Sequence, residues 1–122
     1  MKKHNLAFVD LETTGTNPEK HEIIEIGCIV VEQVARIGRG PELKKIDELD
    51  IKVQPKHIEQ AEPGALRVNG YNEADWLFAT DLKTALETLA YKTRGCIIVG
   101  QNIAFDWAFL EKGLEKTSIM HQ

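Results

Sequence analysis

The feature that most constrains the fold is a short apolar run, Leu6–Val9, that ends directly at Asp10. A continuous apolar run of this length is typical of a strand buried on both faces of a sheet. A longer β-branched run, Ile23–Val31, predicts a second strand, and the alternation of apolar and polar residues over 49–54 predicts a half-exposed third strand. Turn-forming residues separate the three runs, so we expect an antiparallel meander.

After Pro55 the hydrophobic pattern changes to the spacing of helices. Apolar residues recur every three or four positions over Ala79–Ala90, which predicts a helix of about 14 residues. Cys96–Val99 reads as another short buried strand, and a second helical stripe follows over Ile103–Leu114. The order β-β-β-α-β-α predicts an α/β fold with a mixed sheet, and 122 residues is the length of one domain.

No apolar stretch approaches the roughly 20 residues that a membrane-spanning helix needs. The run Leu6–Val9 is also shorter than the apolar region of about 7 to 15 residues in a signal peptide, so we expect a cytoplasmic protein without membrane contact. Cys28 and Cys96 lie in β-branched runs, where reduced thiols are commoner than a disulfide. Three histidines lack metal-ligand spacing and are expected at surface or loop positions: His4, His21 and His57.

The net charge of the chain is −4, from 15 basic and 19 acidic residues, whereas nucleic-acid binders are usually basic on their contact face. This is weak evidence against nucleic-acid binding, because cations bound by a cluster of carboxylates reverse the local sign of charge. One basic cluster is compatible with backbone binding, although such a run is more often a solvated hairpin: Arg36, Arg39, Lys44 and Lys45.

Two carboxylates, Asp10 and Glu12, stand two residues apart at the carboxyl end of the first predicted strand. On an extended segment their side chains project to the same side. Neighbouring carboxylates repel each other unless a cation neutralises them, and hard oxygen ligands suit Mg²⁺ or Mn²⁺. The pair alone is also compatible with exposed charge at a turn, so the flanking residues decide between the two interpretations.

The segment Phe8–Gly15 resembles the first motif of the DnaQ-like, or DEDD, family of 3′–5′ exonucleases. In this motif the chain is similar to the proofreading epsilon subunit of DNA polymerase III. Val99–Asp106 resembles the second motif, in which a strand end is followed by Asn-x-x-Phe-Asp. Ile23–Gly27 and Val68–Tyr71 resemble the family's second strand and the segment before its first long helix. The resemblance spans almost the whole chain and implies a ribonuclease-H-like fold.

This resemblance implies hydrolysis of DNA or RNA from a single-stranded 3′ end by two divalent ions, Mg²⁺ or Mn²⁺. Asp10 is then expected to bridge both ions, Glu12 to hold the ion that activates water, and Asp106 to hold or orient the second ion. A DNA polymerase subunit is a possible protein partner. The resemblance leaves the choice between DNA and RNA open, since discrimination of the 2′-hydroxyl depends on local groove geometry.

The family resemblance also implies substrate contacts. Main-chain groups of Leu11, Glu12 and Thr13 are expected to meet the terminal nucleotide, and Val68 and Phe105 to pack against its base. Asn102 has two open roles, as the N-cap of the following helix that holds Asp106 in place or as a direct substrate contact.

A complete family member carries a third motif, His-x-x-x-x-Asp or Tyr-x-x-x-Asp, after a fifth strand, and none precedes Gln122. We therefore expect residues 1–122 to form a single incomplete exonuclease domain, truncated before the fifth strand and the last helix. The fourth carboxylate and the general base are not identifiable, so the chain is expected to be weakly active or inactive. The alternative is a non-catalytic module that binds a nucleic-acid end or a polymerase partner. In the family's sheet order, 3-2-1-4-5, Cys96–Val99 becomes an apolar edge, which predicts a homo-oligomer through that edge.

Overall fold

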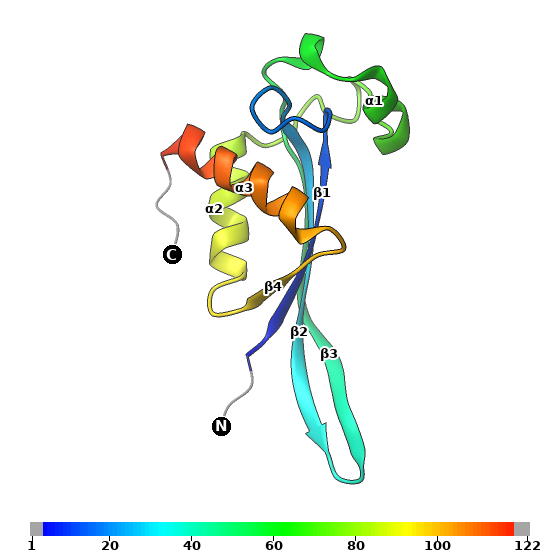
Figure 1. The fold of residues 1–122 in the computed structure, drawn as a ribbon, viewed down its shortest axis with the longest axis vertical. Coiled ribbons are helices and arrows are strands. Elements are labelled where there is room, and N and C mark those ends of the chain that lie inside the picture. Colours follow the sequence, from blue (N-terminus) through cyan, green and yellow to red (C-terminus); the bar gives the residue numbers. More distant parts are fainter. Residues whose placement is uncertain (1–3, 119–122) are drawn as a thin grey trace.

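The fold is that of a computed structural model, whose description covers residues 4–118. Residues 1–3 and 119–122 lie outside the described residues. This includes Gln122, the residue from which the missing third motif was argued. The side chains of residues 36, 39 and 41 also lie outside the description. Figure 1 shows a sheet with two long helices on one side. The elements are β1 (Leu6–Thr13), β2 (Ile23–Arg36), β3 (Arg39–Lys52), a 3-10 turn (Ile58–Gln60), α1 (Pro63–Asn69), α2 (Leu82–Lys92), β4 (Ile97–Val99) and α3 (Ile103–Thr117).

The four strands form one mixed sheet in the order β3-β2-β1-β4. β1 and β3 both run antiparallel to β2, and β4 runs parallel to β1. The predicted meander, the mixed sheet and the β-β-β-α-β-α order of the long elements are therefore confirmed. No helix in the described part of the chain has both the length and the apolar character needed to cross a membrane.

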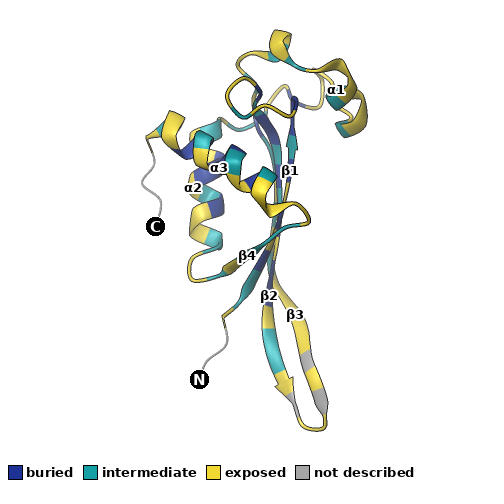
Figure 2. Cartoon of the chain, viewed as in Figure 1, coloured by how far each residue is buried: buried dark blue, intermediate teal, exposed yellow. Residues whose placement is uncertain are grey.

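β1 has one buried and one open face, so the prediction that it is buried on both faces was wrong. Ala7, Val9 and Leu11 are buried, whereas Phe8 and Asp10 are exposed. The physical reason is that α2 and α3 both pack on the same face of the sheet, and no described element covers the opposite face (Figure 2). The second face is therefore available to a ligand.

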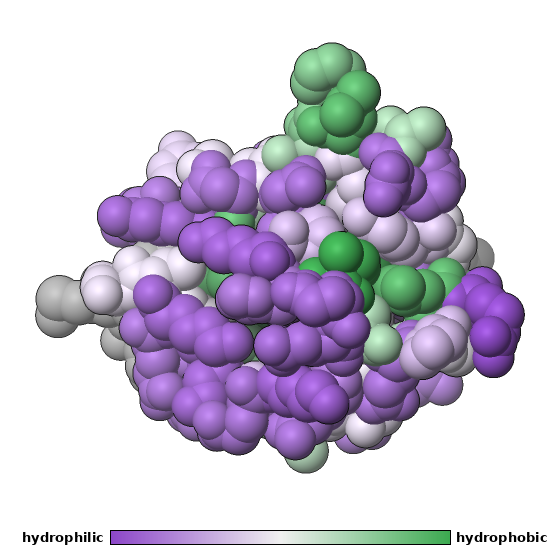
Figure 3. Space-filling model, turned by 90° about the horizontal axis from the view of Figure 1, so that it is seen from above, coloured by the Kyte–Doolittle hydropathy of each residue, from purple (hydrophilic) through white to green (hydrophobic). Residues whose placement is uncertain are grey.

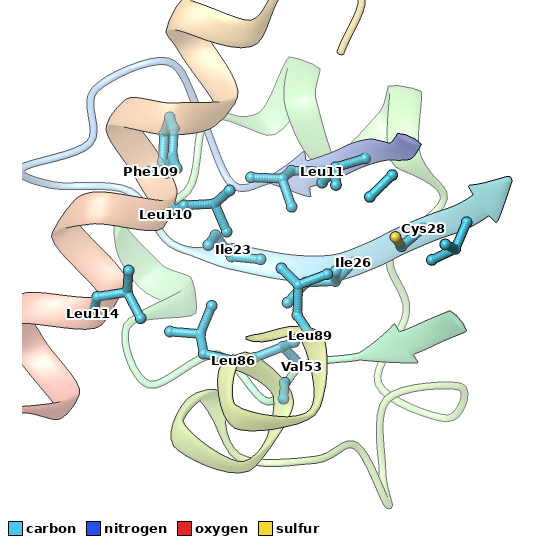
Figure 4. Close-up of a cluster of buried hydrophobic side chains, with 14 residues drawn as sticks. Leu11, Ile23, Ile26, Cys28, Val53, Leu86, Leu89, Phe109, Leu110 and Leu114 are labelled. Atoms are coloured by element: carbon cyan, nitrogen blue, oxygen red, sulfur yellow. The ribbon is translucent and has the colours of Figure 1, made fainter. Parts of the chain in front are cut away.

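The hydrophobic core lies between the sheet and the two helices (Figure 4). α2 contributes Ala85, Leu86 and Leu89, which belong to the stripe that the sequence predicted. In α3 the predicted stripe is partly wrong, because Ile103 and Trp107 are about two fifths exposed. The residues of α3 that face the core are Asp106, Phe109, Leu110, Gly113 and Leu114.

α2 begins later than its apolar spacing suggests, because Asp81 caps its N-terminus. The Asp81 carboxylate accepts hydrogen bonds from the Thr84 backbone N–H at 3.1 Å and from its hydroxyl at 2.8 Å. At the other end, Lys92 Nζ lies 3.0 Å from Asp47 Oδ2 and joins α2 to β3. These contacts fix the helix against the sheet at both ends.

β3 is much longer than the sequence predicted, since it begins at Arg39 and pairs with β2 up to Arg36. Figure 1 shows the two strands projecting together beyond the rest of the sheet. Residues 42–46 are all exposed, so this part of β3 has no buried face and lacks the apolar alternation by which strands are recognised in sequence.

Candidate active site

Three carboxylates lie near the carboxyl end of β1, close enough for their charges to influence one another. Asp10 and Glu12 project from the open face of the strand, and Asp106 lies in the first turn of α3. Burial, and after it the negative charges of Asp10 and Asp106, raises the pKa of Glu12. Burial and then the charge of Asp10 likewise raise the pKa of Asp106. The three side chains are thus close enough to destabilise one another's ionised forms.

Gly100 makes room for the Asp106 carboxylate. A Cβ at Gly100 would stand 3.1 Å from Asp106 Oδ2 and 3.5 Å from the Val9 carbonyl oxygen. The carboxylate therefore lies over the backbone that links β4 to α3, next to β1. Asp106 is only 6% exposed, and its place in the first helical turn favours a negative charge.

A groove of about 1090 Å³ runs over the open face of the sheet beside these carboxylates. Its lining includes Phe8, Asp10, Glu12, Ile29, Glu48 and Val68. Val68 is 88% exposed, and the end of the molecule that carries α1 shows a gathering of hydrophobic surface (Figure 3). The groove therefore has acidic and apolar sections side by side.

A second acidic pair, Glu25 and Asp50, lies beside Glu12. Glu12 stands opposite Glu25 in the β1–β2 register. Burial raises the pKa of Glu25, and a hydrogen bond with Asp50 raises it further. Lys52 Nζ lies 3.7 Å from Glu25 Oε2 and offsets part of this charge. With so many carboxylates along one wall, a polyanion needs added cations to enter the groove.

The donor set fits a hard divalent cation in its chemistry, because every candidate ligand is a carboxylate oxygen, and burial, followed by the neighbouring negative charges, raises the pKa values of Glu12 and Asp106. Gly100 keeps the space beside Asp106 free of a side chain. Among residues 4–118, no three histidine, cysteine or acidic side chains are already placed together to ligate one ion.

α1 is tied at both ends to the carboxyl end of β1. The Glu62 backbone N–H donates to the Thr14 carbonyl at 2.7 Å, and Asn69 Nδ2 donates to the Thr13 carbonyl at 3.0 Å. Asn69 Oδ1 also accepts the Tyr71 N–H at 3.2 Å. These bonds hold Val68 at the edge of the groove. Sequence reasoning did not assign a role to Asn69, although the motif that begins at Val68 contains it.

His21 lies in a loop, as predicted, but it is buried, with 5% exposure, and does not lie at the surface. Its Nδ1 accepts the Asn17 N–H at 3.0 Å and lies 3.7 Å from Glu62 Oε1. The ring packs directly on Gly15. The reason is that residues 14–21 fold back on themselves, with the Thr14 N–H bonded to the Glu22 carbonyl at 2.8 Å. This loop sets the direction of the chain that leaves the carboxylates.

The main chain near the carboxylates has an open edge. Leu11 is buried and pairs with Ile26 of β2 on one side. On the other side, β4 pairs with β1 only along Leu6–Phe8, so residues 9–13 have no strand neighbour there in the described structure. The Thr13 hydroxyl donates to the Gly15 carbonyl at 2.7 Å. Leu11 and Thr13 flank Glu12, which lines the groove, but neither of the two is itself in the lining.

Two expected substrate contacts lie elsewhere. Phe105 is half-buried and packs on Phe109, with 4.9 Å between ring centroids, against the core. Asn102 occupies the N-cap position of α3, but its side chain makes no capping hydrogen bond, so the capping interpretation was wrong. Asn102 is instead exposed at the start of the helix, and its carbonyl accepts the Asp106 N–H at 3.1 Å.

Comparison with known proteins places these features in a family. The exonuclease family of RNase T matches residues 7–121. The 3′–5′ exonuclease DinG of Staphylococcus saprophyticus is 32% identical over 124 residues, which cover 100% of this chain. An oligoribonuclease of Haemophilus influenzae is 35% identical over 118 residues, which cover 90% of this chain. The chain therefore belongs to the RNase T exonuclease family, within the DEDD superfamily that its motifs resemble.

The solved structure of Escherichia coli exonuclease I in complex with an oligonucleotide has the same fold, with a TM-score of 0.79 and 17% identity over 94% of this chain. The ribonuclease-H-like fold is thereby confirmed. The chain spans 12% of the DinG protein, 63% of the oligoribonuclease and 24% of exonuclease I.

Proposed function

We propose that residues 1–122 form part or all of one 3′–5′ exonuclease domain, which hydrolyses phosphodiester bonds at a single-stranded nucleic-acid end with divalent metal ions. The observation that carries this proposal is that Asp10 and Glu12 line an open groove, and that the Asp106 carboxylate lies beside Gly100, which lines the same groove. Membership of the exonuclease family supports the reaction class.

In this proposal Asp10, Glu12 and Asp106 hold two Mg²⁺ or Mn²⁺ ions, which, when bound, activate water and stabilise the charge on the phosphoryl oxygens. The protein's own groups position the strand. Val68 packs against the terminal base from the edge of the groove, and main-chain groups of Leu11 and Thr13 bind the nucleotide. Asn102 is exposed within the second motif and stays a proposed substrate contact, whereas Phe105 acts through the core packing of α3.

The relatives support nucleic-acid ends as the substrate class. One related protein is named an oligoribonuclease, and exonuclease I was solved with a DNA oligonucleotide, so both RNA and DNA belong to the proposal. A polymerase partner, a homo-oligomer through β4 and a cytoplasmic location stay predictions. The alternative function, a module that binds a nucleic-acid end without cleaving it, differs only in turnover.

The test is cleavage of 5′-labelled DNA and RNA oligonucleotides by the purified chain with Mg²⁺, Mn²⁺ or EDTA. We expect a ladder that shortens from the 3′ end, requires the metal and disappears in Asp10→Asn. The matched control is Glu87→Gln, which should retain activity because Glu87 is exposed on α2 and does not line the groove. Metal-dependent binding without cleavage would establish the alternative function, and cleavage that persists in EDTA would refute the metal-dependent mechanism.

A further inference from the structure

The β2–β3 arm, residues 32–45, is the part of the molecule that the proposed chemistry does not use. β1 accompanies β2 only as far as Val31, and beyond that point the one strand partner of β2 in the described structure is β3. A hydrogen bond of 2.9 Å from Gln33 Nε2 to the His4 carbonyl anchors the base of the arm. A two-stranded ribbon alone is marginally stable in water, so an arm of this length gains from a binding partner.

The arm is basic although the chain is acidic. It contains four basic and two acidic residues, which give it a charge of +2, whereas the net charge of the chain is −4. The remainder of the chain therefore carries −6. The basic residues of the arm are Arg36, Arg39, Lys44 and Lys45. Charge of this sign, concentrated on a projecting ribbon, is complementary to a phosphate backbone.

The strand register pairs opposite charges near the base of the arm. At the tip, Arg36 stands opposite Arg39 along the backbone. Nearer the base, Lys44 faces Glu32, and Lys45 Nζ lies 3.2 Å from Glu48 Oε2. Opposite charges therefore stabilise the base of the ribbon.

The groove leads from the carboxylates toward the arm. Phe8 and Ile29 face each other across β1 and β2, line the groove, and are 38% and 43% exposed. Beyond them, Ile46 is 46% exposed at the base of the arm. Arg36 lies eleven residues along β2 from Glu25, which is roughly 36 Å at about 3.3 Å per residue. At about 3.4 Å per nucleotide of a stacked strand, this span corresponds to about 10 nucleotides.

We infer that the β2–β3 arm binds the phosphate backbone of the nucleic-acid strand whose 3′ end lies in the groove, up to about 10 nucleotides from that end. The inference rests on the proposed function only for the position of the 3′ end. Binding by the arm itself requires neither the carboxylates nor turnover. The arm thus makes affinity depend on the length of the substrate.

The test is fluorescence anisotropy with 5′-labelled DNA and RNA oligonucleotides of about 4 and about 20 nucleotides, whose 3′ linkages are phosphorothioates that resist cleavage. In the arm variant, Arg36, Arg39, Lys44 and Lys45 are all replaced by glutamine. The matched control replaces four basic residues outside the arm and the groove lining with glutamine: Lys56, Lys83, Arg94 and Lys116. Both variants change the net charge by the same amount.

We expect the arm variant to bind the long oligonucleotide about tenfold or more weakly than the wild type, and the short one less than about twofold more weakly. For this variant, the slope of log affinity against log salt concentration should become shallower by about 0.7 for each phosphate that the arm no longer binds. The control variant should bind both lengths as the wild type does. Unchanged melting temperatures establish that the arm variant is folded.

Equal weakening in the two variants would overturn the inference, because it would show a general effect of charge. So would a wild-type chain that binds both lengths equally. Sedimentation could show that the wild type is a dimer and the arm variant a monomer, while both bind the oligonucleotides equally. That result would also overturn the inference, and it would assign the arm to contact with a second copy of this chain. Length-dependent binding without cleavage would support the inference while refuting the proposed reaction, so the two failures are distinguishable.

Discussion

Replacing Gly15 with alanine tests the packing that directs the loop after the carboxylates. An alanine Cβ at this position would stand 2.4 Å from Nδ1, 2.5 Å from Cε1 and 2.6 Å from Cγ of the His21 ring. Ordinary contacts begin at 3.4 Å, so the ring must move by about 1 Å. His21 is 5% exposed, and its hydrogen bond with the Asn17 N–H opposes this movement.

The expected cost has two parts. Overpacking of a well-packed site costs about 1–3 kcal/mol. Displacement of the ring also weakens the 3.0 Å hydrogen bond from the Asn17 N–H to His21 Nδ1, which is worth about 0.5–1.5 kcal/mol. We therefore expect Gly15→Ala to lower the free energy of unfolding by about 2–4 kcal/mol. For a domain of this size, that lowers the melting temperature by roughly 8–16 °C.

The assay is thermal unfolding by circular dichroism, with urea unfolding as a second measure of the free energy. Gly40→Ala is the control, because nothing lies within 4 Å of its added Cβ. It should change stability by less than about 0.5 kcal/mol. A Gly15→Ala protein that melts within about 2 °C of the wild type would refute the packing argument.

A double-mutant cycle then locates the clash. His21→Ala removes the ring, so adding Gly15→Ala to that background should cost little further stability. If Gly15→Ala is equally destabilising in both backgrounds, the strain lies in the backbone and not at His21.

Two further changes test the site. Asp106→Asn should raise the melting temperature at pH 7 in EDTA. The pKa of Asp106 is raised in the folded state, so the ionised carboxylate destabilises the native state at pH values above that pKa. This destabilisation is lost as the pH falls through the folded-state pKa. A stability gain that is the same at every pH would contradict this assignment. Asn69→Ala removes the 3.0 Å bond to the Thr13 carbonyl and should weaken binding of a 3′ end by roughly 2- to 13-fold, whereas Asn72→Ala, in the neighbouring turn, should not. Equal binding by the two variants would show that Asn69 does not position α1.

The local patterns of the sequence were sufficient for the antiparallel meander and the α2 face, whereas the order of all four strands was predicted from the family resemblance. Residues two apart on a strand share a face, so Asp10 and Glu12 were expected on one side of β1, and the burial pattern of β1 alternates accordingly. Asp106 was identified only through its motif, because its nearness to Asp10 depends on β4 lying next to β1.

Only the tertiary structure decided which face of the sheet stays open, because that depends on both long helices packing on the same side. It also decided that His21 is buried and that Asn69 reaches the Thr13 carbonyl from 56 residues away. No local period encodes such contacts, since they form only when distant segments pack together. A hairpin was expected in this region, but the extension of the two strands into the β2–β3 arm was missed: its exposed strand 42–46 buries neither face, so it carries no hydrophobic period for sequence reasoning to detect.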